Sequence, residues 1–255
     1  MPSKNYTRLT GLVLVCILGV SACGSATRST ASPKETTSTT PGAPPGAPPG
    51  APPGGSGGGG DNAAQITAKG AYVHTAGTTS TLGKTYRASA TNTSGVLNTG
   101  GSLTLDKATV STSGASSSSD QSSFYGLDAG VLAKAGSITM NGGSTVTTGD
   151  GANGIFAYGS GTAVTLSGTG ISATGKYAHG IMVSGGGTIT ATNVTASTTN
   201  SNGAVIATYR GGGTITVSGG SYSTSGTDSP GIYSTGRISV AGATVKATGA
   251  EAAVT

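Results

Sequence analysis

From residue 61 onward, apolar and polar residues alternate in short runs that are separated by Gly, Ser, Asn or Asp. Such alternation, with a period of two, places the apolar side chains on one face of a β-strand. The runs also recur: GGGTITATNVTAST begins at Gly185, and GGGTITVSGGSYST begins at Gly211, 26 residues later. The pattern therefore predicts a repeated unit of short strands and turns.

Each predicted unit starts at a glycine followed by an apolar residue and contains three short runs, the second of which has two apolar columns. The starting glycines are Gly95, Gly130, Gly154, Gly180, Gly203 and Gly231. One column is Leu103, Ile138, Val164, Ile189, Ile215 and Ile238, and the other is Leu105, Met140, Leu166, Ala191, Val217 and Val240. Between the columns stand Thr104, Thr139, Thr165, Thr190, Thr216 and Ser239.

These columns predict that the units stack as coils, with aliphatic files inside and hydroxyl files outside. A single unit cannot bury its own apolar face, so the core must come from stacking one unit on the next. Three strands in a coil of about 25 residues are typical of a parallel β-helix, an all-β fold.

Through these ladders, residues 65–255 resemble right-handed parallel β-helix proteins of bacterial surfaces, the pectate-lyase-like superfamily. That group includes pectin-degrading enzymes, autotransporter passenger domains and lipoproteins described as adhesin-like. The resemblance implies a right-handed single-stranded parallel β-helix of about 6–7 coils over residues 61–255. Ala253 and Val254 would open another coil just before Thr255, so we expect either a missing C-terminal segment or a partner stacked on this end.

The N-terminus predicts a cell-surface address. Lys4 and Arg8 precede an apolar stretch, residues 9–20, and small residues follow, as in a secretory signal peptide over residues 1–22. The end of this segment, Val-Ser-Ala-Cys, resembles the lipobox of bacterial lipoproteins, which implies that Cys23 carries a lipid anchor. Residues 23–60 are rich in Ser and Thr and then in Pro and Gly, which predicts an extended linker.

Composition and charge argue against several classes of ligand. Charged residues make up 8% of the chain and the basic ones are scattered, whereas a nucleic-acid-binding protein needs a clustered basic face. The repeats contain no cysteine, and His74 and His179 stand far apart in the aligned units, so we expect no metal and no cofactor. The sequence GDGANG at residues 149–154 is followed by no predicted helix, so it does not indicate a phosphate site.

An enzymatic function would need clustered carboxylates for acid–base work or for calcium. The repeat region offers Asp106, Asp120, Asp128, Asp150, Asp228 and Glu251, which fall in different coils. We expect no catalytic residue among them, and we expect Asp150 to form an ordinary surface ion pair with Lys176 of the next coil.

Tyrosines are the candidate ligand contacts, because an exposed aromatic ring can stack on a sugar. Tyr158, Tyr209, Tyr222 and Tyr233 lie in or beside predicted strands, where they could equally close gaps and cover edges. The longest interval between starting glycines contains SGASSSSDQSSFYGLDA, which predicts a loop that leaves the coil. Phe124 and Tyr125 in this loop either pack back on the coil or face a ligand.

We therefore expect a lipid-anchored surface scaffold without catalytic activity, adhesin-like or binding a polysaccharide or another cell-surface ligand. One alternative is a polysaccharide lyase or glycoside hydrolase of the pectate-lyase-like fold. A second is an ice-binding protein that uses the Thr188–x–Thr190 and Thr214–x–Thr216 ladders, although neighbouring coils interrupt that face.

Overall fold

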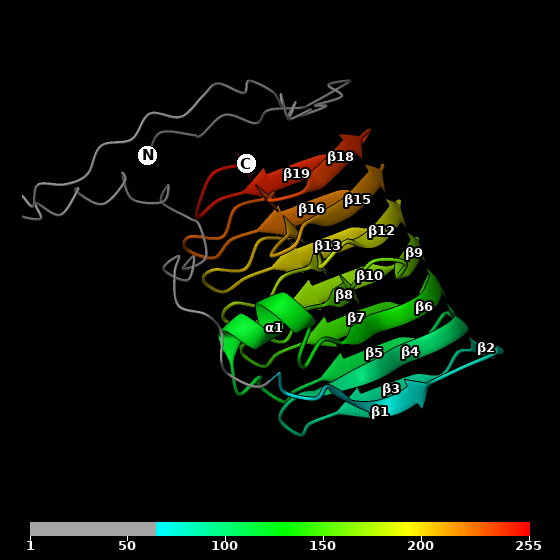
Figure 1. Cartoon of the computed structure of the whole chain (residues 1–255). Coiled ribbons are helices and arrows are strands. Elements are labelled where there is room, and N and C mark those ends of the chain that lie inside the picture. Colours follow the sequence, from blue (N-terminus) through cyan, green and yellow to red (C-terminus); the bar gives the residue numbers. More distant parts are fainter. Residues whose placement is uncertain (1–64) are drawn as a thin grey trace, which may run out of the picture.

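The structure is a computed structural model that describes residues 65–255, and these residues wind into a right-handed parallel β-solenoid of about seven turns. Figure 1 shows the turns stacked one on another from β1 to β19, with α1 lying against one side of the stack. The predicted fold class is confirmed. Cys23, the predicted signal peptide and the predicted linker lie outside the described residues.

A complete turn has three strand positions, and in two turns the first and second positions fuse into one long strand. The first-position strands are β1 (Lys69–His74), β8 (Ile155–Tyr158), β11 (Ile181–Ser184), β14 (Ile206–Thr208), β17 (Ile232–Tyr233) and β20 (Ala253–Val254). The second-position strands are β2 (Thr78–Leu82), β9 (Ala163–Ser167), β12 (Gly187–Thr192), β15 (Gly213–Ser218) and β18 (Arg237–Ala241). The third-position strands are β3 (Thr85–Ala88), β5 (Thr109–Thr112), β7 (Ser144–Thr147), β10 (Gly170–Ala173), β13 (Thr195–Thr198), β16 (Ser221–Thr224) and β19 (Thr244–Ala247). The fused strands are β4 (Thr93–Asp106) and β6 (Val131–Asn141), and helix α1 (Ser119–Tyr125) lies between β5 and β6.

The first and second positions form one 13-stranded sheet, and the third positions form a 7-stranded sheet. Strands β4 and β6 turn the corner between the first two positions through shifts of register after Asn98 and after Thr99. The buried Asn98 side chain donates hydrogen bonds of 3.0 Å to the carbonyl oxygens of Ala135 and Ser137. An amide side chain thus satisfies backbone carbonyls that the bend takes out of the regular ladder.

The aliphatic ladder predicted from the second runs is confirmed. Leu103 pairs with Ile138, and the register continues in order through Val164, Ile189, Ile215 and Ile238. The first five of these side chains are at most 1% exposed, and Ile238 in the last full turn is half-buried. The threonines between the two columns point outward, and those on β9, β12 and β15 are exposed.

One predicted unit boundary is wrong. Gly203 was expected to start a unit, but Ile206 pairs with Ile181, which places Val205 opposite Gly180. The run from Ala204 to Ala207 is continuously buried, since in this turn the first strand is covered on both faces. Val205 thus stands where the neighbouring turns have a glycine, so the glycine on which the alignment relied is absent there.

The structure adds a turn before the first predicted unit. Thr79 and Thr81 occupy its two inner columns, where they pair with Leu103 and Leu105, so no aliphatic signature marks this turn in the sequence. Tyr72 and Tyr86 pack against the core instead, with ring centroids 5.1 Å apart. Aromatic rings from the first and third strands thus fill the space that branched aliphatic residues fill in later turns.

The glycine that opens most turns is required by the narrow interior at that corner. A Cβ on Gly154 would lie 2.5 Å from Ile171 Cγ2 and 2.5 Å from the Gly180 carbonyl oxygen. Both distances are far below van der Waals contact, and one of the two atoms belongs to the backbone of the next turn. The corner therefore accepts no side chain without displacing a strand.

We expect Gly154→Ala to lower the free energy of unfolding by about 1–3 kcal/mol, because an extra methyl group overpacks this corner. The measurement is the urea midpoint followed by circular dichroism. Gly170→Ala is the matched control, because its Cβ would meet nothing closer than 3.8 Å. That control should be neutral or slightly stabilising. Equal midpoints for Gly154→Ala and the wild-type chain would contradict the account of the corner.

His179 is fully buried in the segment that connects β10 to β11. Burial lowers the pKa of its imidazole from 6.5 to about 4, and the Ala204 carbonyl opposes this shift in part. Above pH 6.5 neither the folded nor the unfolded chain carries this proton. As the pH falls from 6.5 to 4, the unfolded chain takes up a proton that the folded chain excludes, so stability is lost over that window.

We expect this histidine to cost the fold about 3 kcal/mol of stability between neutral pH and pH 4. His179→Leu removes the titrating group while nearly conserving volume. The difference in unfolding free energy between the variant and the wild-type chain should therefore grow in favour of the variant as the pH falls. Urea denaturation at pH 7.5, 6, 5 and 4 measures it, and a difference that stays constant across this range would refute the assignment.

Candidate ligand-binding site

The first-position strands are apolar on their outer face as well as on their inner one. Their outer file contains Leu97, Leu132, Phe156, Met182 and Ala207, all buried. Such an apolar outer face must be shielded from water, and residues 113–130, which include α1, lie over it (Figure 1). The predicted loop thus forms a short helix that lies across several turns, and it packs back on the coil as one of the two alternatives foresaw.

Helix α1 is defined by caps that its sequence encodes. The Ser118 side chain accepts a hydrogen bond of 3.2 Å from the Gln121 N–H, and Gly126 ends the helix with a φ of 73°. Ser184 Oγ on β11 donates a hydrogen bond of 2.6 Å to the Phe124 carbonyl oxygen. Contacts from the coil therefore fix the C-terminal end of α1, where its two aromatic residues stand.

Asp128 closes the loop after α1. Its buried carboxylate accepts hydrogen bonds from the N–H groups of Asn92 at 2.5 Å and Thr93 at 3.0 Å. Burial raises the pKa of this carboxyl group, and the two backbone hydrogen bonds act against that shift. The contacts tie the loop to the preceding turn, so Asp128 has a structural role rather than a place in a site.

Five aromatic rings form a continuous row along the edge of α1, which we call the aromatic row: Tyr158, Tyr125, Phe124, Tyr209 and Tyr233. Successive ring centroids are 5.4, 6.3, 5.5 and 5.6 Å apart. The interplanar angles range from 31° to 85°, and edge-to-face and tilted pairs are favoured over flat stacks. Two residues of the row come from α1 and three from the ends of first-position strands, so the row exists only in the folded coil.

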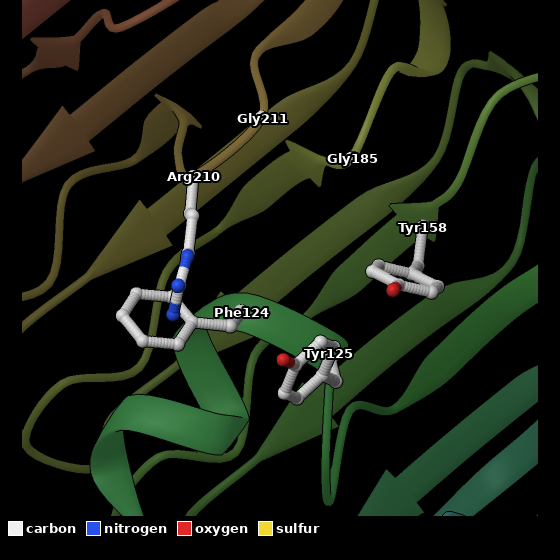
Figure 2. Close-up of a pocket in the computed structure, with 6 residues that line it drawn as sticks. All are labelled: Phe124, Tyr125, Tyr158, Gly185, Arg210 and Gly211. Atoms are coloured by element: carbon white, nitrogen blue, oxygen red, sulfur yellow. The ribbon is translucent and has the colours of Figure 1, made fainter. Parts of the chain in front are cut away.

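An open hollow of about 200 Å³ lies beside the row, lined by Phe124, Tyr125, Tyr158, Gly185, Arg210 and Gly211 (Figure 2). Gly185 and Gly211 form the floor of the hollow, and the backbone and packing at Gly185 leave little room for a side chain. A Cβ on Gly185 would lie 3.1 Å from Tyr158 Cε2, and its φ of 60° is a conformation that L side chains rarely adopt. The missing side chain leaves the Tyr158 ring and the hollow accessible.

Two cations lie over rings of the row. The Arg210 guanidinium is 5.0 Å from the centre of the Phe124 ring, and Lys134 Nζ is 5.3 Å from the centre of the Tyr158 ring. Both distances are within the range of cation–π attraction. Burial lowers the pKa of the Lys134 ammonium. Positive charge thus lies beside the aromatic row at two places, and Arg210 also lines the hollow.

The structure brings three of the four tyrosines of the sequence hypothesis into the aromatic row, but in different roles. Tyr158 lines the hollow, whereas Tyr209 is only 9% exposed and packs between Phe124 and Tyr233. Burial raises the pKa of Tyr209 to about 12, and the charges of Tyr233 and Asp120 act in the same direction. Tyr222 cannot contact a ligand, because it is fully buried inside the coil, where burial raises its pKa as well.

Sequence reasoning missed both cations. Lys134 stands at the bend of β6, where alternation breaks down, and Arg210 precedes the glycine turn at residues 211–213. The one available signal was the adjacency of Arg210 to Tyr209.

The carboxylates weighed for catalysis serve local contacts. The Asp106 carboxylate accepts a hydrogen bond of 2.7 Å from Asn141 Nδ2. Asp150 does approach Lys176, but its carboxylate accepts a hydrogen bond of 2.9 Å from the backbone N–H rather than forming the expected contact with the ammonium. Within residues 65–255, no three His, Cys, Asp or Glu side chains gather closely enough to hold a metal ion.

The outward hydroxyl files stack as their spacing predicted. Thr188 pairs with Thr214, and Thr190 pairs with Thr216. Ala163 and Arg237 occupy the neighbouring positions of the first of these files, so it is interrupted on both sides.

No protein-family model, no curated protein and no solved structure gives a significant match to this chain. Across residues 65–255, no helix has the length and apolar character needed to cross a membrane.

Proposed function

We propose that this chain is a lipid-anchored protein of the bacterial cell surface, an adhesin-like β-helix scaffold that binds a glycan at the aromatic row and has no catalytic activity. The observation that carries the proposal is the open hollow lined by Phe124, Tyr125 and Tyr158 beside a floor of glycine. Ligand sites characteristically combine apolar and aromatic walls with a few polar groups that orient the ligand.

A sugar suits such a hollow because one face of its ring carries C–H groups and its edge carries hydroxyls. The aromatic faces of the row can pack against the first, and the phenol oxygens and the guanidinium can bond the second. The row is fixed by the coil and by the caps of α1, so a ligand would order few side chains on binding. A binding role is favoured over catalysis because the carboxylates of the described residues are dispersed over separate turns.

We expect Tyr158→Ala in the full chain to weaken glycan binding at least tenfold, since it removes a wall of the hollow. A glycan array identifies the ligand, and titration calorimetry with the best oligosaccharide measures the affinity. Tyr177→Ala is the matched control, because Tyr177 is a half-buried tyrosine in the turn before β11 and does not line the hollow. That control should bind as the wild-type chain does.

Two results would contradict this function. One is an array with no bound glycan. The other is the release of unsaturated or reducing sugars from polygalacturonate, alginate or glycosaminoglycans, together with loss of that turnover on changing Asp106 or Asp150. The second result would point to the polysaccharide lyase or glycoside hydrolase alternative.

We expect Cys23→Ser to abolish lipid attachment, because the thiol is the group to which the diacylglyceryl moiety is joined in bacterial lipoproteins. The full chain expressed in a bacterial host should incorporate an alkyne-labelled fatty acid and sediment with membranes, whereas the variant should do neither. Cys16→Ser is the control and should behave as the unchanged chain. Equal labelling of the chain and of Cys23→Ser would reject the anchor.

A further inference from the structure

Lys134 is a cation without a counter-charge. Its side chain is half-buried, and within residues 65–255 the Tyr158 ring is the only partner of its ammonium. Desolvation is the sole cause of the lowered pKa of Lys134, so no carboxylate of the described chain compensates its charge. A cation held this way costs free energy that an anionic ligand would recover.

The position of Lys134 places this charge at one end of the site. Ala133 pairs with Ala157, so Lys134 stands one turn before Tyr158, and Tyr158 pairs with Ser184, which precedes Gly185. A Cβ on Gly211 would lie 3.0 Å from Gly185 Cα, which places Gly211 on the turn after that. Lys134, Tyr158, Gly185 and Gly211 therefore come from four consecutive turns, which span about 14 Å at the usual strand spacing.

Arg210 marks the other end of this floor, where Figure 2 shows its side chain extended over Phe124. The charge there is not purely positive, because Asp120 in the first turn of α1 acts electrostatically on Tyr209. Arg210 also has a further contact of its own. The Lys134 end is thus the one where positive charge remains uncompensated.

We propose that the glycan bound at the aromatic row is acidic, a sugar chain that places a carboxylate or sulfate group against Lys134 while its rings pack on Tyr158 and Tyr125. This inference rests on the proposed glycan-binding function and adds the charge of the ligand to it. The four turns span about 14 Å, so one anionic group can reach the cation while a neighbouring ring covers the tyrosines. Carboxylate and sulfate share the chemistry that a lysine recognises, and separate probes distinguish them.

The test compares three forms of one core sugar with the full chain: lactose, 3′-sialyllactose and 3′-sulfolactose. Titration calorimetry at low and at physiological salt measures each affinity. We expect at least one acidic form to bind ten times more tightly than lactose, with a preference that falls as salt is added. Preference for the sialylated form identifies a carboxylate ligand, and preference for the sulfated form identifies a sulfate ligand.

The variant Lys134→Met keeps the apolar stem and removes the charge. It should reduce the ratio of acidic to neutral affinity to about 1. Lys176→Met, at an exposed lysine of another turn, should keep the full ratio. Equal binding of all three sugars to the wild-type chain would overturn the inference, as would a Lys134→Met variant that weakens all three to the same extent.

The outcomes also separate this inference from the function on which it rests. If lactose and its two acidic forms bind equally well and the binding depends on Tyr158, glycan binding stands and the acidic preference falls. If neither the three forms nor any arrayed glycan binds, both proposals fall together.

Discussion

Parallel pairing in register between successive turns is the interaction on which the rest of this molecule depends. A turn of about 25 residues has no second layer of its own, so its apolar side chains are buried only by the turns above and below it. Register decides which side chains meet. A shift of one residue would move the file from Leu103 to Ile215 out of the interior and bring the outward threonines into it.

The same constraint explains why the candidate site lies where it does. Five strands carry apolar residues on both faces at the first position, which a coil in water does not tolerate unless something covers the outer face. Residues 113–130, which include α1, cover this outer face. The aromatic residues of α1 reach the edge of the covered strands. There they meet the tyrosines at the ends of β8 and β14, and the glycine turns beside them leave the hollow open.

Much of this fold follows from the sequence because identical positions in successive turns have similar neighbours. The second-strand columns could be read residue by residue, since each holds one branched aliphatic side chain above another. The prediction of turns and of their boundaries failed where other residue types occupy the positions that define a turn in the sequence. Tyr72 and Tyr86 replace the aliphatics of the first turn, and Val205 replaces the glycine that opens the neighbouring turns.

The site was harder to predict than the coil. Tyr158, Phe124 and Tyr125 could be nominated as aromatics near strands or in the long loop, but the sequence does not tell which rings meet. Lys134 meets Tyr158 through the register of β6 with β8, whereas Tyr125 meets it only because α1 folds back over turns that follow it in the chain. Tyr222 lies in register with Ala196 and Val245 in the inner column of the third strands, so its ring is inside the coil.

The lateral position of the hollow makes the length of the rod independent of its recognition chemistry. Each turn touches only its neighbours, so turns gained or lost beyond β17 by duplication or deletion would leave the residues around α1 in place. Such events would change the length of the solenoid and leave the residues that line the hollow unchanged. Evolution could therefore adjust reach and specificity separately in this architecture.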